Sequence, residues 1–512
     1  MSDAIDSVEI DEPNGPGKMR KKHPKGLYTL FATEMWERFS YYGMRALLTL
    51  YLTAELVNGG FGLSRQEGLE LYAIFTGLVY LTPIIGGWVA DNFFGQRKTI
   101  YIGGIVMAVG QILLAASAFM SSDLDVESRN FLFNFGLGVL IIGNGFFKPN
   151  ISTIVGEFYD DNDPMKDAAF NIFYLGINLG AILGTFIAGG LGEGVGWGWG
   201  FLTAGIGMIL SVLWLNFKET TLLNHGLPPN GDMTRNKIDG KDWSQILITS
   251  VSLVFGILAL IYVWGMLPDM ATTIITYVVF GSLILGLSYV IFKGTEGVNE
   301  WSRMSVIVVL AVFNVVFWAG FEQAGGTFNL FAKENTQRYI AFLDWEMPAT
   351  WFQNVNSIVI LIGAPLFSIM WLKLDKLKFN PRTPLKFALG LFLGAAAFWV
   401  MSQAKGLADT GVLVSPMWLV VVYTLLTLGE LMLSPIGLSM ITKLAPTKLV
   451  SVVMGLWMAS FAAGNYVAGM LEGILIKYDF ELYPFIMAVM LGSGVLLLLI
   501  SPLLNKAMKG IH

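Results

Sequence analysis

Long apolar stretches alternate with short polar segments along this chain, from Tyr28 to Leu504. Most of these stretches reach the ~20 apolar residues that a helix needs to cross the hydrocarbon core of a bilayer. The pattern predicts six membrane-spanning helices, then two, then six more. The predicted spans are 28–57, 68–91, 97–120, 131–158, 167–192 and 198–217, then 244–264 and 272–293, then 301–331, 349–374, 383–404, 414–443, 448–475 and 483–508.

The breaks between these spans predict an all-α membrane protein with two six-helix bundles and two accessory helices between them, fourteen transmembrane helices in all. We expect a tail at 1–27, the first bundle at 28–217, a linker with the accessory helices at 218–300, the second bundle at 301–508 and a short tail at 509–512. The composition agrees, because 54% of the residues are hydrophobic and only 13% are charged. A soluble domain carries roughly 25% charged residues.

The positions of lysine and arginine predict how the helices are oriented. If the N-terminus is cytoplasmic, only a few of the 32 Lys and Arg residues fall on the outer side. Those few are Arg65, Arg129, Lys333, Arg338, Lys405 and Lys477. Cytoplasmic loops are enriched in Lys and Arg, so we expect a multi-pass protein with both termini in the cytoplasm.

The composition argues against several kinds of chemistry. The chain has no cysteine, and its three histidines, His23, His225 and His512, lie outside the predicted spans. A membrane-embedded enzyme would need a nucleophile or metal ligands that these spans do not supply. We therefore expect no enzyme activity, no metal and no cofactor. The expected surroundings are bilayer lipid and not nucleic acid, because no basic face is evident.

A few ionisable residues fall deep inside the predicted spans, where an unpaired charge is costly and therefore suggests a function. They are Glu34, Glu37, Arg38, Arg45, Lys148, Glu322 and Glu430. With a rise of ~1.5 Å per residue, Arg38 and Lys148 lie roughly 15 Å from the cytoplasmic ends of their helices, and Glu430 roughly 20 Å. Arg45 and Glu322 both lie roughly 26 Å in. We predict a mid-membrane layer of charges and an outer pair, each contributed by both bundles.

Glu34, Glu37 and Arg38 form a cluster within the first predicted span. Residues four apart share a helix face, so we expect Glu34 and Arg38 to pair. Two carboxylates beside one guanidinium in a low-dielectric site favour a proton on one of them. We predict that this cluster carries a proton. The alternative is a permanently paired cluster that holds the first helix to the fourth.

All of the deep charges except Arg45 belong to longer motifs, and one further motif carries no deep charge. These are Glu34-x-x-Glu37-Arg38-Phe39-x-Tyr41-Tyr42-Gly43, residues 145–150, residues 173–181, Trp318-x-x-x-Glu322-Gln323 and Gly429-Glu430-x-x-x-Ser434-Pro435. Together they resemble the signatures of the proton-dependent oligopeptide transporter family. This family is a branch of the major facilitator superfamily, whose two six-helix halves the predicted layout also resembles.

The resemblance implies a proton-coupled symporter that imports di- and tripeptides by alternating access, with the proton as coupling ion and no other cofactor. An extra helix pair is typical of prokaryotic members, which implies a bacterial inner (plasma) membrane, and we expect a functional monomer. The alternative is a transporter of the same superfamily for another small polar substrate, such as nitrate, a sugar or a drug.

The resemblance and the deep charges together assign roles to single residues. Proton coupling is expected of Glu34, Glu37, Arg38 and Glu322. Gating is expected of two pairs, Arg45 with Glu322 and Lys148 with Glu430. Peptide binding is expected of Arg38, Tyr41, Tyr42, Tyr80, Lys148, Asn178, Trp318, Asn356, Glu430, Ser434 and Trp457. Packing inside a bundle is the alternative role for the aromatic side chains Tyr80, Trp318 and Trp457.

Overall fold

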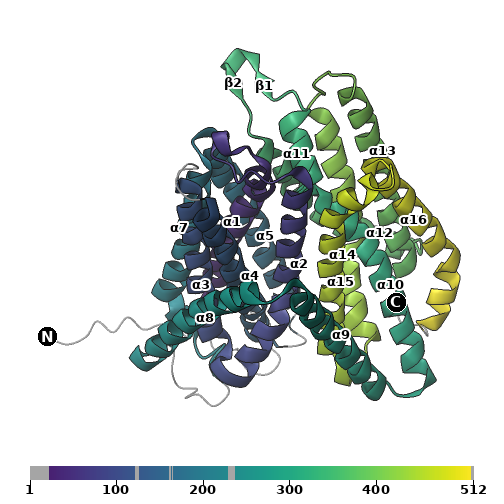
Figure 1. The fold of residues 1–512 in the computed structure, drawn as a ribbon. Helices are drawn as coiled ribbons and strands as arrows, with labels where there is room; N and C mark the ends of the chain where they lie inside the picture. Colours follow the sequence, from purple (N-terminus) through teal and green to yellow (C-terminus); the bar gives the residue numbers. More distant parts are fainter. Residues whose placement is uncertain (1–21, 121–125, 161–162, 164, 229–236, 509–512) are drawn as a thin grey trace.

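A computed structural model describes residues 22–120, 126–160, 163, 165–228 and 237–508 (Figure 1). The predicted tail at 509–512 and most of the predicted tail at 1–27 lie outside these residues. Two helical bundles stand side by side, one from each half of the chain (Figure 1).

The order of the helices is the predicted six, two and six, if α5 with α6 and α10 with α11 are each taken as one interrupted helix. The first bundle contains α1 (Lys25–Thr53), α2 (Arg65–Val89), α3 (Gly95–Phe119), α4 (Val126–Glu157), α5 (Met165–Gly184), α6 (Gly190–Gly194) and α7 (Trp197–Lys218). The accessory helices are α8 (Gly240–Met266) and α9 (Asp269–Gly294). The second bundle contains α10 (Gly297–Phe321), α11 (Thr327–Glu334), α12 (Asn354–Lys376), α13 (Thr383–Ala408), α14 (Met417–Leu444), α15 (Val450–Ile476) and α16 (Leu482–Ala507).

Hydropathy supports this arrangement as a membrane protein. Within the described chain, 11 stretches are long and apolar enough to span a bilayer, and one of them, Arg65–Phe119, contains both α2 and α3. Between α2 and α3 the chain turns at Gly95, whose φ of 71° lies in the left-handed region that favours glycine.

Two departures from the predicted elements concern loops that were predicted to lie on the outer side. The first span was predicted to reach residue 57, but α1 ends at Thr53 because the chain turns, with Gly59 at φ 69°. The predicted loop between 331 and 349 is not irregular throughout. It contains a small antiparallel hairpin of β1 (Tyr339–Ile340) and β2 (Trp345–Glu346), so the otherwise all-α fold carries one short sheet.

Each bundle has its own hydrophobic core. Buried aromatic residues such as Phe133, Phe147 and Phe201 fill the first core, which is built almost entirely from α1 to α7. Phe317 and Phe398 belong to the second core, built mainly from α10 to α16. Separate cores allow each of the two bundles to move as one body.

Glycines bring α5 into backbone contact with α1. A Cβ atom at Gly180 would lie 2.2 Å from the carbonyl oxygen of Met35, and one at Gly184 would lie 2.2 Å from that of Phe39. Only glycine permits such an approach, and small residues of this kind are typical of helix packing in membranes. The contact fixes the rotation of α1 and therefore the direction of its Glu34 to Arg38 segment.

The accessory helix α8 is attached to α3 at its polar end. Lys98 forms an ion pair with Asp242, and its Nζ donates to Gln245 Oε1 at 2.9 Å. The ring of Trp243 lies 5.0 Å from that of Tyr101. Most of the apolar length of α8 is exposed, since 11% of its spanning window is buried. Such an exposed apolar surface suits a helix that faces lipid.

Candidate functional site

The predicted cluster on α1 is present and buried. Arg38 Nε lies 3.0 Å from Glu34 Oε1 and also forms an ion pair with Glu37, with both carboxylate side chains at most 3% exposed. The predicted pairing of Glu34 with Arg38 is confirmed. Within the described residues, Glu34 Oε2 and Arg38 Nη2 are buried without a hydrogen-bond partner. Such buried, unpaired atoms are costly and retain unused hydrogen-bonding capacity.

The fourth helix meets this cluster through Asn144. Its Nδ2 donates to Glu37 Oε1 at 3.3 Å, and the residue is 1% exposed. Lys148 lies one turn further along α4. Its ammonium group lies 4.5 Å from the centre of the Tyr80 ring, a cation–π contact.

Glu430 on α14 supplies the negative charge of the second bundle. Asn356 on α12 donates from Nδ2 to Glu430 Oε2 at 3.0 Å and to Thr427 Oγ1 at 3.0 Å. The amide therefore holds the carboxylate in place. In the described conformation Glu430 and Lys148 form no ion pair with each other, so their predicted gate remains a prediction for another state of the cycle.

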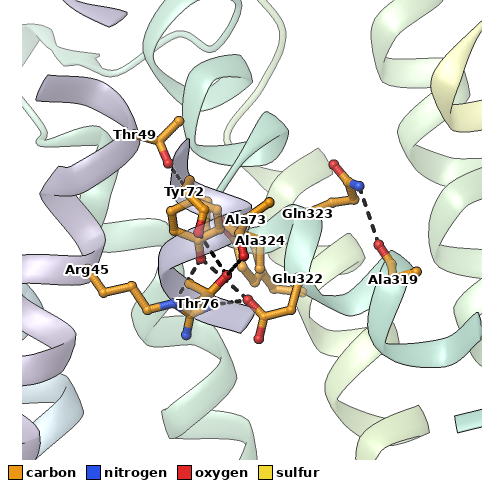
Figure 2. Close-up of polar contacts among 11 residues, drawn as sticks. Arg45, Thr49, Tyr72, Ala73, Thr76, Ala319, Glu322, Gln323 and Ala324 are labelled. Atoms are coloured by element: carbon orange, nitrogen blue, oxygen red, sulfur yellow. Dashed lines mark hydrogen bonds and ion pairs between the residues drawn. The ribbon is translucent and has the colours of Figure 1, made fainter. Parts of the chain in front are cut away.

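The predicted outer pair joins the two bundles. Arg45 on α1 forms an ion pair with Glu322, the residue that directly follows α10. Tyr72 on α2 accepts a hydrogen bond from Arg45 Nε at 2.8 Å and lies 3.4 Å from Glu322 Oε2. Figure 2 shows the three side chains converging, with Thr49 close by. Thr49 Oγ1 donates to the carbonyl oxygen of Gly325 at 2.7 Å, a second bond between the bundles. The meeting of Arg45 and Glu322, predicted from helical rise, is confirmed.

Glu193 in α6 makes a further contact between the bundles. Its carboxylate accepts from the backbone N–H groups of Ala349 at 3.1 Å and Thr350 at 2.9 Å, and from Thr350 Oγ1 at 2.9 Å. Lys333 Nζ lies 3.5 Å away, and the Glu193 side chain is only 4% exposed. The Glu193 carboxylate thus accepts hydrogen bonds from backbone N–H groups of the short helical turn that precedes α12, groups that have no partner within the turn.

The predicted aromatic residues divide between two environments. Arg38 lies 5.4 Å from the Tyr41 ring, and Arg45 lies 5.8 Å from the Tyr42 ring. On the second bundle, Trp318 lies 4.7 Å from the Phe461 ring, which also stacks on Tyr80 at 5.9 Å. The Phe461 ring therefore links aromatic residues of the two bundles.

Three other predicted binding residues are placed differently. Trp457 is 0% exposed, as expected of a core residue, so its predicted role in binding needs a conformational change. Asn178 donates to the carbonyl oxygen of Tyr174, on its own helix, at 3.0 Å. Ser434 Oγ is buried and has no hydrogen-bond partner among the described residues.

The sequence interpretation missed Asn144, Tyr72, Thr427 and Glu193. Asn144 had a signal, because it lies four residues before Lys148 and therefore on the same helix face. Tyr72 and Thr427 had none, since hydroxyl residues in a span are commonly structural. Glu193 lies just beyond the predicted end of its span, where a carboxylate is ordinary.

Comparisons with known proteins match most of the chain. The sequence profile of the POT family matches residues 97–486. The peptide transporter YePEPT of Yersinia enterocolitica is 36% identical over 493 residues, covering 94% of each chain. The di-/tripeptide transporter of Lactococcus lactis subsp. cremoris is 32% identical and covers 96% of this chain and 97% of its own. A crystal structure of a mutant peptide transporter POT in complex with alafosfalin superposes with a TM-score of 0.79 at 34% identity, covering 97% of this chain and 98% of the other.

Proposed function

Since the chain belongs to the POT family, we propose that it is a symporter that couples the import of di- and tripeptides to inward proton movement. Relatives that match almost its whole length are named peptide or di-/tripeptide transporters. Its multi-pass helical fold is suited to transport. We place it in a bacterial inner membrane with both termini in the cytoplasm, as the distribution of Lys and Arg predicts.

The observation that carries this proposal is the distribution of charge between the bundles. Arg38 and Lys148 supply positive charge from the first bundle, and Glu430 supplies negative charge from the second. A peptide of any sequence has a carboxylate at one end and an ammonium group at the other. We infer that Lys148 and Arg38 bind the carboxylate, while Glu430 and Asn356 bind the amino end. Because only the two charged ends of the peptide are recognised, peptides with many different side chains can bind.

The conformation supports alternating access. Arg45 with Glu322, Thr49 with Gly325, and Glu193 with Thr350 join the bundles on the predicted outer side. Lys148 and Glu430, nearer the predicted cytoplasmic side, have separate partners. We infer that the described state is closed to the outside, and that pairing between the bundles closes the other side later in the cycle.

Proton coupling is proposed to run through carboxylates. Arg38 holds both Glu34 and Glu37. A proton on either one removes a charge that competes for the guanidinium, so Arg38 becomes freer to bind a peptide carboxylate. Glu322 is the second candidate, because a proton there would weaken its hold on Arg45 and favour opening of the outer side.

Uptake of a labelled dipeptide into proteoliposomes tests the proposal. We expect accumulation with an inward proton gradient, and only equilibration without one. Equal accumulation with and without the gradient would contradict proton coupling. Uptake of nitrate or a sugar, without competition by dipeptides, would support the alternative substrate class.

A further inference from the structure

Asn144 has an unused hydrogen-bonding atom next to the proposed proton site. Its Nδ2 donates to Glu37 Oε1 at 3.3 Å, whereas its Oδ1 is buried without a partner in the described part of the chain. The residue is 1% exposed. A buried amide oxygen that is left unpaired is costly, so the environment of Asn144 is incomplete when Glu37 is a carboxylate.

We propose that Asn144 is a positioning residue that follows the protonation of Glu37 by turning its side-chain amide. When Glu37 is charged, Asn144 donates its N–H to the carboxylate. When Glu37 holds a proton, the amide turns over and Oδ1 accepts the new O–H of Glu37. This inference rests on the proposed proton-coupled transport.

The chemistry of the two groups supports such an exchange. A charged carboxylate only accepts hydrogen bonds, while a protonated one also donates. An asparagine amide has both a donor and an acceptor at nearly the same distance from Cγ. Rotation about its terminal bond exchanges them without moving α4. The proton enters from the outer solution and leaves to the cytoplasm, so one O–H bond of Glu37 forms and breaks in each cycle.

The position of Asn144 connects the proton to the peptide site. Lys148 lies four residues later on the same face of α4, and we propose that it binds the peptide carboxylate. The charged groups that face Glu37 are Glu34 and Arg38 from α1 and Lys148 from α4. Asn144 is a neutral residue that contacts Glu37 directly. It therefore connects α1, which carries the proposed proton site, to α4, which carries Lys148.

The alternative is that Asn144 only braces α4 against α1. A brace would keep one fixed hydrogen bond from its N–H group to Glu37 in both protonation states, and its amide would not turn when Glu37 gains a proton. A pH profile therefore tests whether Asn144 acts on the titrating carboxylate, and a direct measurement of the amide distinguishes rotation from a fixed brace.

The first measurement compares Asn144→Leu with the matched control Asn134→Leu, which makes the same change at an exposed position of α4. Hydrogen bonds to a charged group are about twice as strong as neutral ones, so the variant loses more in the carboxylate state than in the protonated state. We expect its half-maximal uptake to move to higher pH by about half to one unit. We also expect at least tenfold lower gradient-driven uptake, with counterflow retained. An unchanged pH profile in Asn144→Leu would overturn the proposal.

The second measurement does not need the variant to fold. Infrared difference spectra of the unsubstituted protein, carrying isotope-labelled asparagine, are recorded between high and low pH. We expect an asparagine amide band to change together with a carboxyl band, and both changes to disappear in Glu37→Gln. A carboxyl band of Glu37 that changes while no asparagine band follows contradicts the proposed amide rotation. Failure of the unsubstituted protein to take up any dipeptide would instead contradict the proposed function.

Discussion

Replacing Glu322 by Gln should open the outer side of the protein. The Glu322 side chain is 2% exposed and that of Arg45 is 12% exposed, so their ion pair is largely shielded from water. Removing one partner of a buried pair costs ~3–5 kcal/mol, because the other charge is left uncompensated. Arg45 keeps its hydrogen bond to Tyr72 at 2.8 Å, so we expect the lower end of this range.

This cost applies only to the closed outer side, because water solvates Arg45 once that side opens. A penalty of about 3 kcal/mol changes the ratio of closed to open molecules by roughly 100-fold. If the outer side of the unsubstituted protein is open in one of several tens of molecules, that side would be open in most molecules of Glu322→Gln. The expected effect is large enough to measure as a change in population.

The chain contains no cysteine, so spin labels attach only to cysteines that are introduced for the measurement. Spin labels on Val57→Cys, after α1, and Phe342→Cys, in the hairpin loop, report the distance between the bundles on the outer side. Both residues are highly exposed, at 84% and 86%. We expect double electron–electron resonance to show a longer distance as the main population in Glu322→Gln.

Thr49→Val serves as a graded control. It removes the neutral hydrogen bond to Gly325, which contributes about 1 kcal/mol, so its shift should be roughly fivefold. If Glu322→Gln gives the same distance distribution as the unsubstituted protein, the Arg45–Glu322 pair does not hold the outer side closed. The same conclusion follows if Thr49→Val has the larger effect.

Variants at three further residues test the remaining parts of the site. Lys148→Ala should abolish peptide accumulation, and a dipeptide amidated at its C-terminus should bind poorly to the unsubstituted protein; equal affinity for free and amidated peptide would refute the carboxylate role. Glu37→Gln should lose gradient-driven uptake while counterflow survives, since exchange needs no net proton movement; full acid-stimulated accumulation would make this carboxylate structural. Glu193→Ala should lengthen the outer spin-label distance, whereas Glu193→Gln, which keeps an acceptor oxygen, should do so less; equal distances in both would show that the hydrogen bonds of Glu193 do not hold the bundles together.

Much of the fold was predictable because membrane spans are long and repeat a simple apolar pattern. The depth of a charge was also predictable, since helical rise converts sequence position into height, and Arg45 and Glu322 do meet. Height does not give the rotation of a helix or the distance between bundles. Lys148 and Glu430 were placed near one level, yet each has a different partner in the described conformation.

Contacts at helix ends were the hardest to predict. Glu193 finds Ala349 and Thr350 only because a short turn precedes α12 and because α6 continues the interrupted α5. Neither feature has a signature in hydrophobicity. Asn144 was missed for another reason. A single amide in a span is inexpensive and common, and its role depends on the charged residue that happens to face it.

The separate partners of Lys148 and Glu430 lead to a final prediction about the other gate. Neither side chain needs the opposite bundle, since Lys148 lies over Tyr80 and Glu430 accepts from Asn356. A peptide with both ends charged can contact both groups at once, and only such a ligand gains energy when the bundles approach on the cytoplasmic side.

Spin labels on Thr153→Cys in α4 and Thr442→Cys in α14, both exposed positions, report this approach. A free dipeptide should shorten the distance between the labels. A dipeptide acetylated at its amino end has lost the charge that Glu430 recognises, so it should leave the distance unchanged even at concentrations that occupy the site. If the acetylated peptide shortens the distance as much as the free one, closure does not depend on contact with both bundles. The energy for closure would then have to come from the proton alone, through Glu37 and Arg38, with the peptide carried passively.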